Sequence, residues 1–236
     1  MEFIAHRGAS AHAPENTLAS FKKALEMKAK AIELDIAESR DGRLVVIHDD
    51  DLKRVAKMPG RVETYTAARM KKIDVGSWFS KEYAGEGIPT LEEVFKLVGQ
   101  MAEINVEMKG GCRIYPKIEE KLCRLLKKQA AQSRFLISSF DHEALFHFRA
   151  LDGDARIGYL LGRTSKSRAF REMAELKAES LNLSARQVNA RIVSEAHSKG
   201  FKVLVYTVNK IKEARSLEKI GVDGIFTNFP EMKNDF

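Results

Sequence analysis

Short apolar runs alternate along this chain with longer segments in which apolar residues recur every three or four positions. The short runs are typical of buried strands, and the longer spacing is typical of amphipathic helices. The expected strands are residues 3–5, 31–36, 44–47, 104–108, 135–138, 157–161, 181–183, 202–208 and 224–226. The expected helices are residues 18–30, 90–100, 114–129, a segment beginning near 142, 169–177, 188–199 and 211–220.

This alternation predicts a parallel sheet with helices packed on it. Apart from residues 44–47, eight strand runs remain, and eight strands in 236 residues fit an α/β fold of the TIM (β/α)8 barrel type. A doubly wound open sheet is the main alternative, although no G-x-G-x-x-G sequence follows the first strand. We expect one domain over residues 1–236, with an insertion after the second strand at about residues 50–88, where the alternation is lost.

The formal net charge of +7 raises the question of an anionic partner. The basic residues are spread along the chain with acidic residues between them, which is typical of solvated helix faces. Hydrophobic residues make up 44% of the chain, but no run approaches the ~20 apolar residues that span a bilayer. We therefore expect neither nucleic acid as a partner nor stable membrane insertion.

The cysteines and the first residues bear on the compartment. Cys112 and Cys123 do not make a disulfide framework, and two free thiols are typical of a reducing compartment. The opening residues show no basic region followed by an apolar run, so no signal peptide is predicted. We expect a cytoplasmic protein.

Two carboxylates share one face of the second expected strand. Because side chains alternate along a strand, Glu33 and Asp35 point away from the apolar residues between them. Two neighbouring carboxylates repel each other, and burying them without a partner is costly. Either a hard divalent cation or pairing with Arg and Lys residues would resolve this conflict.

Other reactive side chains also lie at the ends of expected strands. Glu107 and Lys109 share a face at the end of residues 104–108, His6 and Arg7 follow the first strand, and His48 follows residues 44–47. Because barrel enzymes build their sites at the carboxyl ends of the strands, we expect these groups to converge.

This set of groups suits phosphodiester cleavage. A cation held by the three carboxylates Glu33, Asp35 and Glu107 would act as a Lewis acid, and oxygen ligands favour Mg²⁺ or Ca²⁺. Arg7 and Lys109 would bind further phosphate oxygens. Two histidines, one accepting a proton and one donating it, would activate the nucleophile and protonate the leaving alkoxide.

The motifs along the chain resemble those of the glycerophosphodiester phosphodiesterases. They occur in the family's order over nearly the whole length: His6-Arg7-Gly8, Pro14-Glu15-Asn16-Thr17, Glu33-Leu34-Asp35, Asp41-Gly42, His48-Asp49, Ile88-Pro89-Thr90-Leu91, Val106-Glu107-Met108-Lys109, Ser138-Ser139-Phe140, Thr207-Val208-Asn209 and Gly221-Val222-Asp223-Gly224. The first two motifs, eight residues apart from His6 to Pro14, are the most specific.

The resemblance implies a role for each candidate residue. It implies that Glu33, Asp35 and Glu107 bind the metal, that His6 and His48 are the general acid/base pair, and that Arg7 and Lys109 contact the phosphate. It implies supporting positions for Glu15, Tyr206 and Asn209. The substrate would be a small glycerophosphodiester, such as glycerophosphocholine or glycerophosphoethanolamine, cleaved to glycerol 3-phosphate and an alcohol. No oligomeric state is indicated.

The sequence departs from the family pattern at positions outside the metal and acid/base set. Tyr206 stands where tryptophan is common, Asn228 where aspartate is common, and Ser39 where threonine is usual. These departures bear on substrate choice. A lysophospholipase D-like activity on the same scaffold, which would need an apolar acyl groove lined by Met58, Trp78 and Phe79, is an alternative. A non-catalytic phosphate-ligand or nucleic-acid binding protein is a more distant one.

Overall fold

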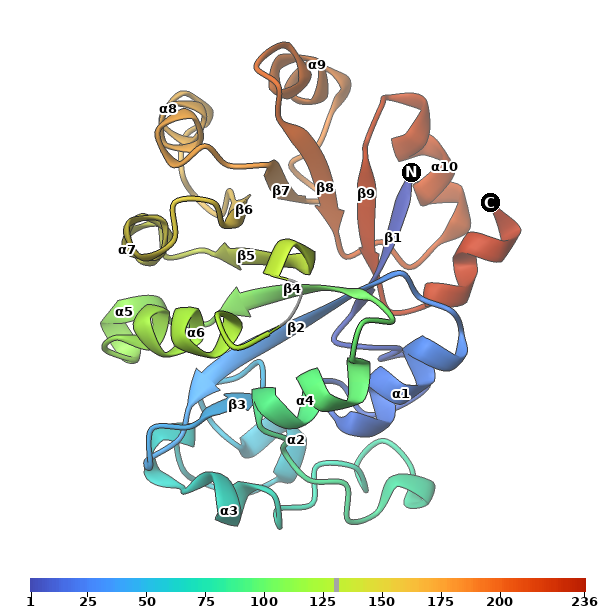
Figure 1. The fold of residues 1–236 in the computed structure, drawn as a ribbon. Helices are drawn as coiled ribbons and strands as arrows, with labels where there is room; N and C mark the ends of the chain where they lie inside the picture. The colour runs from blue at the N-terminus through green and yellow to red at the C-terminus, as the bar shows by residue number, and fades with distance from the viewer. Residues whose placement is uncertain (130–131) are drawn as a thin grey trace.

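The described residues form a closed barrel of parallel strands. The computed structural model describes residues 1–129 and 132–236, with the side chains of residues 112 and 113 outside this description. The barrel closes because β1 pairs with both β2 and β9, which confirms the TIM barrel and excludes the open sheet (Figure 1). Its strands are β1 (Glu2–His6), β2 (Ala31–Glu38), β4 (Glu103–Met108), β5 (Phe135–Ser139), β6 (Arg156–Leu160), β7 (Ser180–Ser184), β8 (Lys202–Tyr206) and β9 (Gly224–Thr227).

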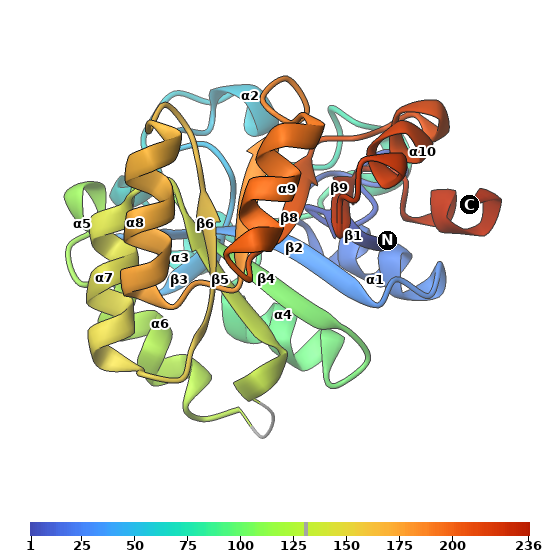
Figure 2. The ribbon, with the colours of Figure 1, turned by 90° about the horizontal axis from the view of Figure 1, so that it is seen from above.

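Helices surround the barrel and cover its outer face (Figures 1 and 2). The longer ones are α1 (Leu18–Glu26), α4 (Leu91–Val98), α6 (Ile118–Leu126), α7 (His142–Leu151), α8 (Lys166–Leu176), α9 (Ala190–Ser198) and α10 (Ile211–Lys219). Thr90 and Glu93 form a capping box at the start of α4, and Asp141 caps α7. Short 3₁₀ turns, η3 (Gln132–Arg134) and η4 (Pro230–Asp235), precede β5 and end the chain.

Two expected helices differ most from the structure in their bounds. The helix expected over 114–129 is two helices, α5 (Gly111–Ile114) and α6. Pro116 explains the break, because it lacks an N–H and disfavours helical backbone at the residue before it. The first helix ends at Glu26 rather than residue 30, since Lys28 adopts a positive φ of 58° that no α-helix contains.

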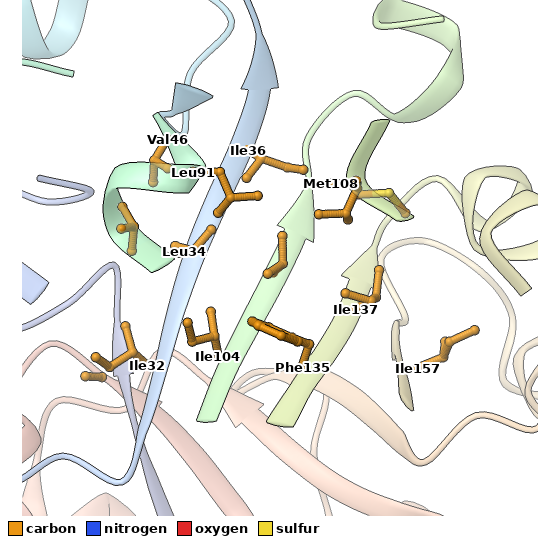
Figure 3. Close-up of a cluster of buried hydrophobic side chains, with 14 of the residues drawn as sticks. Ile32, Leu34, Ile36, Val46, Leu91, Ile104, Met108, Phe135, Ile137 and Ile157 are labelled. Atoms are coloured by element: carbon orange, nitrogen blue, oxygen red, sulfur yellow. The ribbon is translucent and has the colours of Figure 1, made fainter. Parts of the chain in front are cut away.

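The barrel wall has an apolar outer face and a largely polar upper interior. Ile32, Leu34 and Ile36 of β2 pack outward with residues of β4, β5 and α4, as Figure 3 shows. The interior holds a much smaller apolar cluster of Ile4, Ala31, Leu136, Leu204 and Phe226. The interior positions nearer the carboxyl ends of the strands therefore remain available for polar side chains.

The expected insertion lies between β3 (Leu44–Val46), which pairs antiparallel with the end of β2, and α4. It consists of loops and the short helices α2 (Lys53–Ala56), η1 (Val62–Thr64), α3 (Ala67–Met70) and η2 (Lys81–Tyr83). This segment lies beside β3 and α4 at one side of the barrel (Figure 1). It therefore reaches the rim where β2 and β4 end.

Two expectations from composition can be compared with the structure. None of the helices in the described ranges combines the length and apolar character needed to cross a bilayer. Cys123 is buried with a free thiol, and the Cys112 side chain lies outside the described residues.

Candidate active site

A central cavity of about 180 Å³ opens at the carboxyl ends of the barrel strands. Seven of the predicted site residues line it: His6, Arg7, Glu33, His48, Glu107, Lys109 and Tyr206. Two wider grooves, of about 510 Å³ and 650 Å³, meet this cavity at Lys109. The structure thus brings together groups from β1, β2, β4, β8 and the loop after β3.

The three predicted carboxylates form an acidic cluster inside the cavity rim. One oxygen from each of Glu33, Asp35 and Glu107 lies within 4.8 Å of the others. The strand register explains this, because Asp35 and Glu107 are direct partners on neighbouring parallel strands. Clustered carboxylate oxygens are the ligands that hard divalent cations prefer, so this donor set could hold a metal ion.

Two cations lie against the acidic cluster. The Arg7 side chain approaches Asp35 at 3.3 Å, and its backbone N–H donates to Glu33 at 2.9 Å. Lys109 Nζ lies 2.9 Å from Glu107 and 3.9 Å from Asp35. Asp35 thus contacts both cations, and their positive charges offset the cost of burying its carboxylate.

The pKa values within the cluster follow this uneven distribution of charge. Burial, opposed and outweighed by Arg7 and Lys109, leaves the pKa of Asp35 below its usual range. Burial and then the charge of Asp35 raise the pKa of Glu107 to about 7 and also hold the pKa of Glu33 well above its usual range. With all three carboxyl groups ionised, the cluster would carry more negative charge than its two cations balance, which fits a divalent cation.

Stability in the presence of a chelator should respond to pH through Glu107. A carboxyl group whose pKa is about 7 in the folded chain binds its proton more tightly there than in the unfolded chain. Its contribution to the free energy of unfolding therefore falls as the pH rises from about 4.5 to 7. Glu107→Gln lacks this penalty. Its stability relative to the native protein should rise by on the order of 2 kcal/mol between pH 4.5 and 8. Urea unfolding at both pH values measures this, and a pH-independent difference would contradict the assignment.

His6 is held by an amide group. Its Nδ1 lies 2.8 Å from Asn228 Oδ1, and its Nε2 lies 4.0 Å from Glu33. The amide oxygen accepts the Nδ1 proton, which leaves the Nε2 lone pair available. Burial and the nearby charge of Arg7 lower the pKa of His6 to about 4, so the ring is neutral at pH 7.

His48 has a carboxylate partner instead. Its Nδ1 lies 2.6 Å from Asp49 Oδ1, and its Nε2 lies 3.2 Å from Lys109 Nζ. Burial and the charges of Arg7 and Lys109 together lower the pKa of His48, although Asp35 and the hydrogen bond to Asp49 act in the opposite direction. The carboxylate of Asp49 would stabilise positive charge on the His48 ring if it forms, whereas the amide of Asn228 gives His6 weaker support of this kind.

Arg54, from α2 of the insertion, hydrogen-bonds both to Asp49, the partner of His48, and to Glu15, the partner of Arg7. Its Nε donates to Asp49 at 2.6 Å, and its two terminal nitrogens donate to the two oxygens of Glu15, both at 2.7 Å. Glu15 also accepts from Arg7 at 2.8 Å. The guanidinium therefore orients the partner of His48 and the partner of Arg7 together.

Replacing Arg54 should impair the reaction without abolishing it. Arg54→Gln removes the bidentate contact and frees Asp49, so we expect kcat/KM to fall by about 10–100-fold, because groups that orient a reacting side chain typically contribute that much. Steady-state kinetics measure the effect. Arg69→Gln is the matched control, since Arg69 is an exposed arginine on α3 of the same insertion and lines neither the cavity nor its grooves. Equal activity of both variants would exclude the positioning role.

The three predicted supporting residues, Glu15, Tyr206 and Asn209, lie at different distances from the cavity. Glu15 contacts Arg7 and Arg54, and Tyr206 lies in the cavity wall, its ring edge-on to Phe140 at 6.1 Å. Burial and the charge of Glu107 raise the pKa of Tyr206 to about 12. Asn209 does not reach the cavity; its Oδ1 accepts from the backbone N–H of Asn228 at 2.9 Å and so supports the partner of His6.

The structure adds residues that the candidate set lacked. Asp49 and Asn228 hold the two histidines, and Asn16 donates to Asp35 at 2.8 Å. Asp49 could have been found because it directly follows His48 in a family motif. The contacts of Arg54 could not have been predicted, since an exposed arginine on a short helix is usually a surface residue.

The chain is similar to known proteins over nearly its whole length. Residues 6–232 match the model of the Glycerophosphoryl diester phosphodiesterase family. A glycerophosphodiester phosphodiesterase of Caldanaerobacter subterraneus subsp. tengcongensis is 39% identical over 229 residues, which cover 97% of this chain and 94% of that protein. Another, of Bacillus altitudinis, is 36% identical over 233 residues, covering 98% and 95%.

Solved structures are similar over the whole chain. An Oleispira antarctica phosphodiesterase in complex with the product sn-glycerol-3-phosphate has a TM-score of 0.91 and 32% identity, covering 100% of this chain and 96% of that one. A glycerophosphodiester phosphodiesterase of Agrobacterium tumefaciens has a TM-score of 0.87 and 25% identity, with both chains fully covered. With sequence and structure matched over nearly the full length, the chain belongs to the glycerophosphoryl diester phosphodiesterase family.

Proposed function

We propose that this enzyme hydrolyses glycerophosphodiesters, such as glycerophosphocholine or glycerophosphoethanolamine, to glycerol 3-phosphate and an alcohol with the help of a divalent cation. The observation that carries the proposal is the convergence of the acidic cluster, two histidines and two cations on one cavity. The family match supports the reaction type, and the Oleispira antarctica relative is described with this product.

The acidic cluster would hold Mg²⁺ or Ca²⁺. Three carboxylates whose mutual repulsion is only partly balanced by Arg7 and Lys109 suit a hard cation better than a soft one. When bound, the cation supplies Lewis-acid stabilisation of negative charge on the phosphate. Arg7 and Lys109 bind other phosphate oxygens and keep the diester oriented for attack.

The two histidines divide the proton transfers. Neutral His6, with Nε2 unprotonated, accepts a proton from the attacking hydroxyl, which is the substrate's own neighbouring hydroxyl in a first step that gives a cyclic phosphate. His48, supported by the Asp49 carboxylate, donates a proton to the leaving alkoxide. In the second step, water opens the cyclic phosphate and the two histidines exchange roles. The released alcohol has a route out through the grooves that meet the cavity at Lys109.

Product analysis tests the function. Purified enzyme would be incubated with a panel of glycerophosphodiesters in the presence of Mg²⁺, Ca²⁺, Mn²⁺ or a chelator, and glycerol 3-phosphate would be measured. We expect release of glycerol 3-phosphate that stops with chelator and returns with added metal. Turnover that continues unchanged after metal removal would refute the metal dependence, and release of glycerol with a phosphorylated alcohol would refute the proposed bond cleavage.

No observation favours the lysophospholipase D-like alternative. Among the described residues, the lining of the central cavity contains none of Met58, Trp78 and Phe79. Trp78 and Phe79 instead pack edge-on against each other, and Phe79 packs in the same way on Tyr83. We expect lysophosphatidylcholine to be a poorer substrate than glycerophosphocholine. The acid/base pair also argues against a purely binding role, which would not require it.

A further inference from the structure

The two grooves that meet the central cavity at Lys109 differ in the side chains that line them. The groove of about 510 Å³ has Phe140 and Phe146 in its wall, and we call it the aromatic groove. The groove of about 650 Å³ is lined by His48, two glycines and charged side chains, and we call it the polar groove; its charged residues are Asp49, Asp50, Asp51, Lys53, Arg61 and Lys109. Both volumes are typical of sites for small molecules, so either groove is large enough for the leaving alcohol.

The position of His48 distinguishes the two grooves. Among the described residues, His48 belongs to the linings of the central cavity and the polar groove but not to that of the aromatic groove. Its Nδ1 is bonded to Asp49, so Nε2 is the atom that can give a proton to the leaving oxygen. A general acid has to lie within hydrogen-bond reach of the oxygen that it protonates. An alcohol that begins beside His48 therefore extends into the polar groove.

The polar groove has no excess of either charge and no apolar wall. Three carboxylates and three cations line it, and its lining in the described part of the chain contains no aromatic or aliphatic side chain. Proteins usually hold a quaternary ammonium group on aromatic faces. A choline group in the polar groove would therefore find neither an aromatic face nor net negative charge.

The charged side chains of the polar groove offer both hydrogen-bond acceptors and donors. One oxygen of Asp50 accepts from the Tyr115 hydroxyl at 3.2 Å, and one oxygen of Asp51 accepts from the backbone N–H of Lys53 at 2.9 Å. The second oxygen of each carboxylate and Lys53 Nζ have no partner among the residues that the structure describes. Because a hydroxyl group both donates and accepts, an alcohol with several hydroxyls can pair with all three.

We propose that the polar groove binds the leaving alcohol and selects polyhydroxylated alcohols over choline. This inference rests on the proposed function and adds the place and the chemical class of the leaving group. Asp50 and Asp51 accept the protons of hydroxyl groups, and Lys53 donates to a hydroxyl oxygen. Each hydroxyl that leaves water thus regains a partner in the groove, whereas a trimethylammonium group gains none.

The test compares three diesters of glycerol 3-phosphate whose leaving groups are the primary alcohols glycerol, choline and propan-1-ol. The glycerol 3-phosphate half and the type of alkoxide are the same in all three, so kcat/KM reports contacts made by the rest of the leaving alcohol. With Mg²⁺ or Ca²⁺ present, we expect the native enzyme to prefer the glycerol ester over each of the others by about tenfold, after correction for its two equivalent ends. About two net hydrogen bonds supply such a factor. Release of glycerol 3-phosphate measures the rates.

Variants in the two grooves locate the preference. Lys53→Met removes a donor from the polar groove, and Asp50→Ala removes an acceptor. In each variant the preference for the glycerol ester should fall to about threefold or less, as expected for loss of one hydrogen bond, while kcat/KM for the propan-1-ol ester stays near the native value. Arg168→Met is the matched control, since Arg168 is an exposed cation in the wall of the aromatic groove that pairs with Glu172. It should keep the full preference.

The outcomes separate the inference from the function on which it rests. Equal kcat/KM of the native enzyme for all three esters would overturn the inference and leave the function intact. A preference lost in Arg168→Met but kept in the polar-groove variants would overturn it by placing the alcohol in the aromatic groove. An equal loss on all three esters in Lys53→Met and Asp50→Ala would assign these residues a structural role instead. Absence of metal-dependent turnover of any ester would refute the proposed function itself. If Asp50→Ala does not fold, Lys53→Met still decides, because Lys53 is exposed.

Discussion

Replacing His48 with alanine should nearly abolish cleavage of an alkyl diester while sparing cleavage of an activated one. For glycerophosphocholine we expect kcat to fall by about 10²–10⁴-fold, because the poor alkoxide leaving group needs a proton from His48. A glycerophosphodiester of p-nitrophenol leaves without protonation, so the pre-steady-state release of p-nitrophenol should fall far less. His6→Ala should slow both substrates by a similar factor, because the attacking hydroxyl must lose its proton in either case.

The comparison of leaving groups also shows which histidine is the general acid and which is the general base. If His6→Ala were the variant that spares the p-nitrophenyl ester, the acid and base assignments would have to be exchanged. If neither variant showed any dependence on the leaving group, or if either retained the native rate, proton transfer by these histidines would be refuted. His197→Ala is a suitable control, since His197 lies outside the cavity and pairs with Asp223 on the surface.

Much of the fold and the chemistry of the site could be predicted from the sequence because both depend on strand periodicity. The alternation of Ile32, Leu34 and Ile36 with Glu33 and Asp35 fixes which face is apolar, and the structure has this arrangement. Parallel strands end at one rim, so side chains at strand ends come together whatever their distance in sequence. The capping residues Thr90 and Asp141 were predictable because their signals are local.

Contacts that depend on loop paths could not be predicted in this way. Asn228 reaches His6 across 222 positions, and Arg54 reaches Glu15 from a helix of four residues that no apolar periodicity marks. These residues required the three-dimensional arrangement of the barrel interior and the insertion.

Removing one carboxylate of the acidic cluster should eliminate both metal binding and activity. Glu107→Gln, Asp35→Asn and Glu33→Gln each remove an anionic oxygen from a set whose three carboxylates converge within 4.8 Å. Stabilisation of transition-state charge by a metal amounts to several kcal/mol, so we expect kcat/KM to fall by on the order of 10³-fold or more. In the native protein, saturating Mg²⁺ or Ca²⁺ should raise the melting temperature, because a ligand that binds only the folded state stabilises it.

The melting temperature distinguishes loss of the metal from loss of the fold. Glu107→Gln and Glu33→Gln relieve buried repulsion, so their metal-free forms should melt no lower than the metal-free native protein at pH 8, while losing the rise caused by metal. Glu38→Gln is the matched control, since Glu38 lies on the same strand as Asp35 but pairs with Lys121 outside the cavity. It should keep both activity and the metal-induced rise. A cluster variant that still responds to metal like the native protein would show that the cation binds elsewhere, because three converging carboxylates cannot lose a ligand without losing affinity.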